Sequence, residues 1–482
     1  MLPAVAPSLR RERMSTVDTA WLRMDAPSNL MMIVAVLLFE RPMEAARLRA
    51  TIESRMLSYR RFRSRVVHEF GAAWWQEQEV DLDYHIVRCR LKRARPDNKA
   101  ALEQLVGELS ATPLDPSQPL WQMHVVDNCI GADGRVRQAI VVRVHHCIAD
   151  GIALVGVLLS MFDASADAPP AEPRQPRLAP LAAENPWMQI MQPVTNATVK
   201  AIDLSGLMWS KYLWMLSDPL KFLGRFAGMG AITTRFTQDA ARLALMSDDS
   251  RTRLKGKPRG MKQVAWSEPL PLTEIKAVGR ALGASVNDVL MASVAGAIGA
   301  YLRAKGDAVA DNCALRAMIP VNLRKAGRKQ ALGNAFGLVP LMLPVGLEHP
   351  LQRLREVRRR MDELKGGYQA LVAMALLGVL GATPRQMQNE IQNYFARKAT
   401  AVMSNVPGPQ APLYLAGSRL DQIMFWVPQS GDIGIGVSIL SYNGGVQFGI
   451  VADDAIAADP DRIIERFAPE FEKLVLLALM ME

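Results

Sequence analysis

Two adjacent histidines followed by an aspartate and a glycine are the part of this 482-residue chain best suited to chemistry. The segment reads His145-His146-Cys147-Ile148-Ala149-Asp150-Gly151, in a chain that has six histidines. Histidine is the side chain best matched to accepting a proton near neutral pH. We therefore expect His146 to act as a general base that takes a proton from a hydroxyl, whose oxygen then attacks an activated acyl group.

The neighbours of His146 indicate a direct transfer. Cys147 follows it immediately, and adjacent strand positions face opposite ways, so no nucleophile is clearly placed and a covalent intermediate is not favoured. Asp150 would either orient a histidine or brace the loop through an arginine, and bracing is the favoured interpretation. Gly151 is expected to open the next helix at a point where no side chain fits.

Two other interpretations of the histidine pair remain. It could be purely structural, or it could contribute to a metal site. Adjacent residues rarely point at one ion, and no other cluster of histidines or cysteines completes a ligand shell. We expect no metal.

Asn287 is a second candidate. It lies in the first turn of a helix that the capping box Ser285-Val286-Asn287-Asp288 opens. An amide there, together with the positive end of the helix, is suited to stabilise a developing oxyanion. The alternative is a polar residue near a cap with no further role.

Strand-like and helix-like segments alternate around these residues. In the first part we expect strands over 31–39, 84–91, 121–126 and 139–144, with helices over 44–57, 99–111 and 151–162. In the second part we expect helices over 271–282, 285–303 and 460–481, and strands over 262–267, 315–323, 336–343, 399–404, 422–428, 433–440 and 446–451.

The composition changes between these two parts. Residues 163–186 are rich in proline and are expected to be a linker. Residues 187–246 have a helical period with many tryptophans and methionines, which predicts a connector that packs against both domains or rests on lipid. We predict an α/β protein with domains over 1–186 and 262–482 and a helical connector over 187–261. The uncharged residues 366–383 are expected to form a buried or tunnel-lining helix rather than a membrane span.

The overall composition limits the classes of partner that the protein can bind. Half the residues are hydrophobic and 22% are charged, which suffices for two ordinary cores. The net charge of +10 favours anionic lipid headgroups or an anionic cofactor over nucleic acid, because no basic–aromatic interleaving accompanies it. A basic run over 250–262 is either a solvated loop or a phosphate-binding or membrane-facing strip. Four scattered cysteines fit a reducing compartment, and no secretory signal is expected.

Several strings together resemble one family. His145 to Gly151 matches the HHxxxDG signature of the coenzyme-A-dependent acyltransferase superfamily. Over most of the chain, the sequence resembles the bacterial wax ester synthase/acyl-CoA:diacylglycerol acyltransferase family. Three further strings carry that resemblance: Pro119-Leu120-Trp121 (the PLW motif), Asn287-Asp288 (ND) and Ser404-Asn405-Val406-Pro407-Gly408-Pro409 (SNVPGP). The opening segments 14–18 and 24–29 are also similar, whereas Cys147 stands where alanine is commoner.

The resemblance implies two chloramphenicol-acetyltransferase-like α/β domains joined by a helical connector, with the active site at their interface. It implies esterification of a long-chain acyl-CoA with a fatty alcohol or diacylglycerol, with acyl-CoA as a substrate and no cofactor. His146 would be the general base, with His145 and Asp150 as supports and Asn287 near the thioester oxygen. The remaining motif residues would shape the fold or the substrate path: Pro119, Leu120, Trp121, Gly151, Asp288, Ser404, Asn405, Pro407 and Gly408.

The resemblance also implies a cytoplasmic protein associated peripherally with the inner face of the membrane or with lipid bodies. Neither the main product nor the oligomeric state follows from the sequence. Two alternatives remain: a condensation-type transferase that uses carrier-protein thioesters, and a non-catalytic lipid-surface protein.

Overall fold

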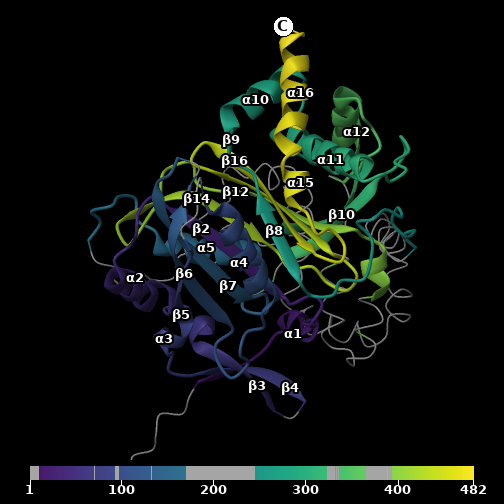
Figure 1. Cartoon of the computed structure of the whole chain (residues 1–482). Helices are drawn as coiled ribbons and strands as arrows, with labels where there is room; N and C mark the ends of the chain where they lie inside the picture. The colour runs from purple at the N-terminus through teal and green to yellow at the C-terminus, as the bar shows by residue number, and fades with distance from the viewer. Residues whose placement is uncertain are drawn as a thin grey trace, which may run out of the picture.

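The fold is built on two large β-sheets with helices packed on them (Figure 1). A computed structural model describes residues 10–69, 71–92, 97–131, 133–169, 245–322, 332, 334, 336–364, 373, 388 and 393–481. Most of the linker and connector, residues 170–244, lies outside the described residues, as does nearly all of the uncharged stretch 366–383. The predictions made for those segments are therefore not addressed by the structure.

The first sheet carries the histidine motif at the end of one of its central strands. Its order is β13-β14-β2-β7-β6-β5. Alternating and continuous apolar runs form these strands because both faces are largely covered. The strands are β13 (Tyr414–Leu415), β14 (Ser418–Trp426), β2 (Met32–Phe39), β7 (Val136–His145), β6 (Trp121–Ile130) and β5 (Ile86–Arg90).

Helical segments of the N-terminal part surround this sheet. They are α1 (Thr16–Arg23), α2 (Ala45–Thr51), η1 (Ile52–Met56), η2 (Arg60–Arg63), α3 (Leu82–His85), α4 (Lys99–Ala111) and α5 (Gly151–Met161). A small separate sheet of order β1-β4-β3 projects at the lower end of the view, and comprises β1 (Arg11–Arg13), β4 (Ala72–Glu77) and β3 (Ser64–Glu69).

The second sheet has the order β11-β10-β12-β15-β16-β8, with β9 also paired to β16. Its strands are β11 (Phe336–Leu343), β10 (Leu315–Asn322), β12 (Ala401–Pro407), β15 (Ile435–Tyr442), β16 (Gly445–Asp453), β8 (Lys262–Trp266) and β9 (Leu270–Pro271). Its helices are α10 (Leu272–Ala281), α11 (Val286–Ala304), α12 (Pro350–Leu364), α15 (Asp461–Ile464) and α16 (Phe467–Leu479).

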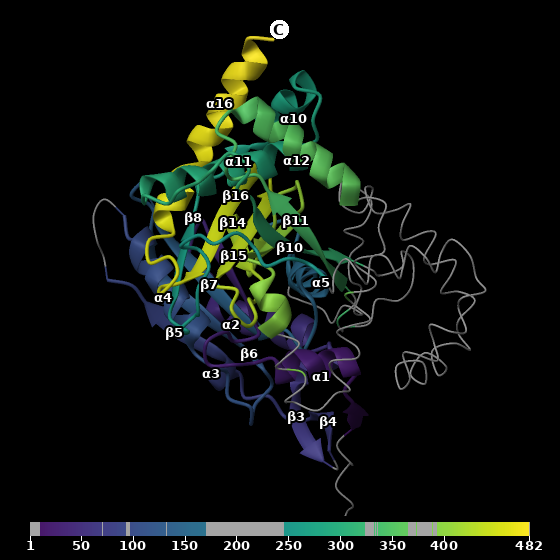
Figure 2. The ribbon, with the colours of Figure 1, turned by 90° about the vertical axis from the view of Figure 1, so that its right-hand side faces the viewer.

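Helix α11 is almost entirely buried and forms the centre of the second core. Helices α10, α12 and α16 lie around it, and α16 extends beyond them so that the C-terminal end is the outermost tip in both views (Figures 1 and 2). No single described helix is long and apolar enough to cross a membrane; α10 and α11 meet that test only as a pair bent by 98°.

One strand crosses between the two halves. Strand β14 belongs by sequence to the second part, yet it pairs antiparallel with β2 in the first sheet, with Met424 opposite Val36. The predicted boundary at residue 262 therefore does not separate the two sheets. A local sequence pattern identifies a strand, but not the sheet in which it finds its partners.

Three local predictions need correction. Residues 82–85 form the short helix α3 rather than the start of a strand, because Asp81 accepts the backbone N–H of Asp83 and caps it. The helix predicted over 460–481 is divided into α15 and α16, and Pro469 lies in the first turn of α16, where proline is tolerated. Helix α12 escaped prediction because a buried arginine, Arg353, interrupts its apolar face.

Candidate active site

His146 lies directly after β7 and is buried, with 3% of its surface exposed. Its ring stacks on the indole of Trp21 from α1, with centroids 4.1 Å apart and planes 19° apart. Phe336, at the start of β11, lies 5.5 Å from the same ring. The first sheet, the N-terminal helix and the edge of the second sheet therefore meet at this imidazole.

Burial lowers the pKa of His146 to about 4, although Asp150, its own carbonyl oxygen and Asn334 favour the charged form. His145 adds to the lowering. The imidazole is thus neutral at pH 7, which is the state that a general base requires.

The other histidine faces a different set of partners. The backbone N–H of Cys147 donates to Nδ1 of His145 at 3.2 Å, and Nε2 of His145 lies 3.7 Å from Oδ1 of Asp25. Burial by itself opposes a charge on His145, but its contacts with Cys147 and Asp25 outweigh burial and raise its pKa above the ordinary value. The same Asp25 oxygen accepts the N–H of Met31 at 2.6 Å, so Asp25 ties the segment before β2 to the motif.

Asp150 caps the helix that follows the motif. Its carboxylate accepts the backbone N–H of Ala153 at 3.0 Å, at the start of α5. Arg61 braces the loop by donating to the backbone carbonyl of Ile148 at 2.8 Å. This contact does not pass through the Asp150 carboxylate, so bracing by Asp150 through an arginine stays a prediction. Asp150 thus serves as a helix cap and as a negative charge near His146.

Gly151 begins α5 as predicted, but the prediction that no side chain fits there was wrong. A Cβ placed on Gly151 would meet only Cγ1 of Val427, at 3.9 Å, which is an ordinary contact. Gly151 lines an apolar pocket, so the space beside it is open rather than filled by protein.

That pocket lies between the two sheets and α5. It is lined by the apolar face of α5, by β2 and β14 of the first sheet, and by the segment after β12. Its lining residues are Ile33, Ala35, Gly151, Leu154, Val155, Leu158, Leu159, Phe162, Val406, Gly408, Pro409, Leu413, Leu420, Ile423, Phe425, Leu440 and Tyr442. An apolar pocket of this kind, with Gly151 of the motif in its wall, is suited to an alkyl chain.

The structure brings the ND and SNVPGP strings together. The side-chain N–H of Asn405 donates to Oδ1 of Asn287 at 2.9 Å, and Nδ2 of Asn287 is buried without a partner. Asp288 completes the predicted capping box with Ser285, which confirms that prediction. Among the described contacts, none joins Asn287 directly to His146.

The other motif residues shape the backbone. Ser404 lies in β12 beside Ser438 of β15, and Pro407 ends β12. A Cβ at Gly408 would lie 2.4 Å from the carbonyl oxygen of Ser441, so only glycine allows this approach to β15.

The PLW string holds the histidine motif through backbone hydrogen bonds and a buried indole. The carbonyl of Leu120 accepts the N–H of His145 at 2.9 Å, and the carbonyl of Pro119 accepts the N–H of Trp121. The indole of Trp121 is fully buried, stacks on His85 and donates to the carbonyl of Phe62 at 2.7 Å.

The basic run over 250–262 is not a uniform surface strip. Lys262 is buried against Asn29 and Asp453, Lys255 is half-buried, and Arg253 pairs with Asp307. The exposed members are Arg251, Arg253, Lys257 and Arg259. The acidic partners of Arg253 and Lys262 come from distant parts of the chain, so the two interpretations of the run, a solvated loop or a phosphate-binding or membrane-facing strip, concern only its exposed members.

Comparison with known proteins identifies the family. The family model described as the wax ester synthase/diacylglycerol acyltransferase catalytic domain matches residues 14–290, and that of the WS/DGAT C-terminal domain matches 332–475. The chain belongs to the wax ester synthase/diacylglycerol acyltransferase family. It is therefore an acyltransferase, and the non-catalytic alternative is not favoured.

Individual relatives agree with this. A protein of Mycobacterium tuberculosis named as a probable diacylglycerol O-acyltransferase is 26% identical over 416 residues, which cover 85% of this chain and 83% of the relative. The structure is similar to the wax ester synthase/diacylglycerol acyltransferase from Marinobacter aquaeolei VT8, with a TM-score of 0.65, 19% identity, and coverage of 97% of this chain and 100% of that one.

A more distant structure shares the fold. The first condensation domain of the CDA synthetase matches with a TM-score of 0.55, 16% identity, and coverage of 98% and 97% of the two chains. These likenesses confirm the predicted two-domain α/β acyltransferase fold.

Several residues that lie near the histidine motif were not predicted from the sequence. Trp21, Phe336, Asn334 and Arg61 received no role, and neither did Asp25. Asp25 lies inside a string already similar to the family, so that string was the available signal. The others are apolar, amide or arginine side chains whose nearness to His146 is set by the fold alone.

Proposed function

We propose that this acyltransferase esterifies a long-chain acyl-CoA with the hydroxyl of diacylglycerol or a fatty alcohol and releases free coenzyme A. The observation that carries the proposal is the neutral, buried His146 in a motif whose last residue, Gly151, lines an apolar pocket. A hydroxyl needs a base, and an alkyl chain needs apolar walls.

The chemistry follows from the residues. Nδ1 of His146 is fully buried, which leaves Nε2 to accept the hydroxyl proton. The hydroxyl oxygen attacks the thioester carbon, and Nδ2 of Asn287 donates to the resulting oxyanion. The C–S bond then breaks, and the imidazolium returns the proton to the departing coenzyme A thiolate. The transfer is direct, with no acyl-enzyme.

A thiol-release assay tests this proposal. With palmitoyl-CoA and either hexadecanol or dioleoylglycerol, the purified protein should release free thiol and form the ester. His146→Ala should fold with an unchanged circular dichroism spectrum and lose nearly all turnover. Full activity in that variant would remove the general base from the mechanism.

The acceptor class needs its own test. The Mycobacterium relative is named for diacylglycerol and the Marinobacter structure for both products, so both acceptors belong to the proposal. A panel of linear alcohols measured against diacylglycerol ranks them by kcat/KM. The condensation-type alternative predicts faster turnover with a carrier-bound acyl thioester than with acyl-CoA.

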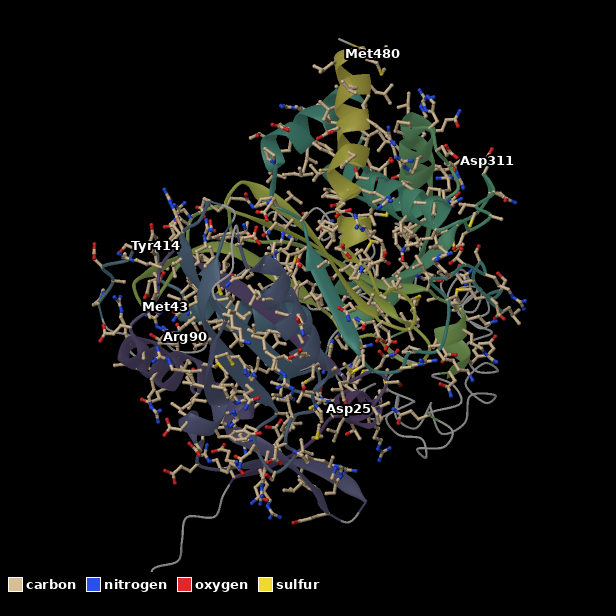
Figure 3. All side chains as sticks on the ribbon, viewed as in Figure 1. Asp25, Met43, Arg90, Asp311, Tyr414 and Met480 are labelled. Carbon is tan, nitrogen blue, oxygen red and sulfur yellow. The ribbon has the colours of Figure 1, made fainter. Side chains whose placement is uncertain are left out.

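We also propose that the protein works at a cytoplasmic lipid surface. The four cysteines are all free, which fits a reducing compartment. The end of α16 exposes four large apolar side chains: Leu476, Leu479, Met480 and Met481. Met480 lies at the outer tip of the molecule, well away from Asp25 beside the site (Figure 3). An exposed apolar helix end of this kind is suited to insert into a lipid interface.

Co-sedimentation with vesicles of phosphatidylethanolamine and phosphatidylglycerol tests the surface. Leu476→Glu/Leu479→Glu should reduce the bound fraction several-fold. Val136→Glu, which changes an exposed apolar residue elsewhere, should not change it. Equal binding by both variants would contradict the assignment of this surface to α16.

A further inference from the structure

We propose that α1 is the positioning element of the catalytic base, with Trp21 fixing the plane of the His146 ring and Asp18 fixing its backbone. The proposal rests on the proposed role of His146 in proton transfer. Neither Trp21 nor Asp18 touches the reacting atoms in this scheme; both act through His146.

The ring contact is geometrically specific. The imidazole and the indole lie nearly parallel at 4.1 Å, and both residues are at most 5% exposed. Phe336 closes the cluster, 5.7 Å from Trp21 and 5.5 Å from His146. A quarter-turn of the imidazole about its Cβ–Cγ bond would break the stack, so the stack fixes the plane in which the ring meets the substrate.

The backbone is held from the same helix. Asp18 precedes Trp21 by three residues, so both lie on one face of α1. Nδ2 of Asn334 donates to Oδ1 of Asp18 at 2.8 Å and to the carbonyl oxygen of His146 at 2.9 Å. The backbone carbonyl of His146 is therefore anchored to α1 through the side-chain amide of Asn334.

A second connection holds the far side of the turn. Nη2 of Arg61 lies 3.0 Å from Oδ2 of Asp18, and Nη1 donates to the carbonyl of Ile148. Asp18 is thus the common partner of two groups that bind the motif backbone on either side of Cys147. Helix α1 itself is fixed by its cap Ser15, whose hydroxyl accepts the N–H of Asp18 at 3.0 Å.

Simple core packing does not account for this arrangement. Asp18 is 1% exposed, and a buried carboxylate is costly unless it is paired. The indole N–H of Trp21 is buried without a partner, a cost that an aliphatic side chain would avoid. A core needs volume alone, whereas these residues supply a flat face and directed hydrogen bonds to the catalytic turn.

Two substitutions of Trp21 separate orientation from volume. Trp21→Phe keeps a flat ring, and Trp21→Leu keeps an apolar side chain without one. We expect Trp21→Leu to lower kcat by about 10- to 100-fold, since a displaced catalytic group costs rates of this order. The KM for acyl-CoA should stay within about two-fold, and Trp21→Phe should restore most of kcat. Asn334→Ala, at a half-buried position, should lower kcat about ten-fold with the same KM.

The pH profile gives a readout that packing alone would not move. The charged or titratable groups around the turn are Asp18 on α1, Asp25 before β2, Arg61 on η2, His145 on β7, Cys147 in the turn and Asp150 at the start of α5, and all six remain in the Trp21 variants. Loss of the indole admits water to His146, so the acid limb of kcat/KM should move to higher pH in Trp21→Leu.

The matched control is Phe467→Leu, which removes a buried ring from the Phe448–Phe467 contact in the second core. It should lower the melting temperature without changing kcat. If Trp21→Leu keeps kcat within two-fold of the wild type and an unshifted acid limb, the positioning role is wrong.

A measurement without turnover separates this result from failure of the proposed function. In histidine-labelled protein, the ring resonance of His146, assigned with His146→Ala, should lose the ring-current shift of the indole in Trp21→Leu. An unchanged resonance overturns the positioning role even if the wild type is active. Absence of thiol release from the wild type, with the shift present, overturns the proposed reaction and leaves the ring geometry standing.

Discussion

The side-chain amide of Asn405 donates a 2.9 Å hydrogen bond to Oδ1 of Asn287. This bond engages the oxygen end of the Asn287 amide, so the buried Nδ2 at the other end is free to donate. Two motifs separated by more than a hundred residues thus act as one donor unit. The helix that carries Asn287 adds its positive end.

The first prediction concerns this unit. Asn287→Ala should lower kcat by about 10²- to 10³-fold, the usual cost of losing one oxyanion donor. Asn405→Asp should be nearly as harmful, because a carboxylate accepts from Nδ2 and consumes the donor. Steady-state kinetics measure both. Gln78→Ala is the control, since it removes a comparable amide–amide bond, to Gln118, from outside the pair. Wild-type kcat in Asn405→Asp would contradict the arrangement.

The second prediction concerns pH. Since burial lowers the pKa of His146 to about 4, the imidazole stays neutral on acidification through pH 6.5, where an exposed histidine would take up a proton. We expect kcat/KM to remain level from about pH 8 down to about pH 5 and to fall below that as His146 is protonated. A profile of thiol release with its midpoint near 6.5 would show instead that the base is solvated.

The third prediction concerns chain length. Gly151→Val places two methyl groups beside Val427 and into the apolar pocket. Turnover with a sixteen-carbon substrate should fall by about ten-fold or more, whereas a short-chain substrate should retain most of its rate. Competition between donors, and then between acceptors, shows which chain occupies the pocket. Equal losses at all chain lengths would indicate damage to the motif rather than to the pocket.

The fourth prediction concerns stability. Nζ of Lys262 donates to Oδ1 of Asn29 at 2.7 Å and lies 3.5 Å from Oδ2 of Asp453, and the Asp453 side chain is fully buried. Lys262→Met removes the cation beside that carboxylate, which keeps the backbone N–H donors of Arg259 and Gly260. The loss should cost about 3 kcal/mol in the free energy of unfolding, the lower end of the cost of breaking a buried ion pair. Lys257→Met, in the same basic run but exposed, should change it by less than about 0.5 kcal/mol. Denaturant titration compares the two, and equal effects would refute the distinction.

The sequence predicts those features that are local. The strand that ends at His145, the helix that begins at Gly151 and the capping box of Ser285 and Asp288 all lie close to their expected positions, because each depends on residues a few places apart. Asn287 and Asn405 were both named as candidate site residues from the sequence, but the hydrogen bond between them could not be predicted.

What escaped prediction depends on contacts between distant residues. Asn29 donates to the carbonyls of Gly431 and Ile433, and Asn334 donates to Asp18. No periodicity or spacing encodes such pairs, since the fold brings them together only after both halves have formed. The same holds for Trp21, whose aromatic character gives no sign of the ring that it covers.

The pairing of β14 with β2 has a consequence for biosynthesis. Until residues 418–426 leave the ribosome, one long edge of β2 has no neighbour, and its backbone N–H and C=O groups offer a template for other strands. The first sheet of the nascent chain therefore stays incomplete until most of the protein has been translated. Chaperone dependence and aggregation on truncation should be greatest for fragments that stop short of this strand.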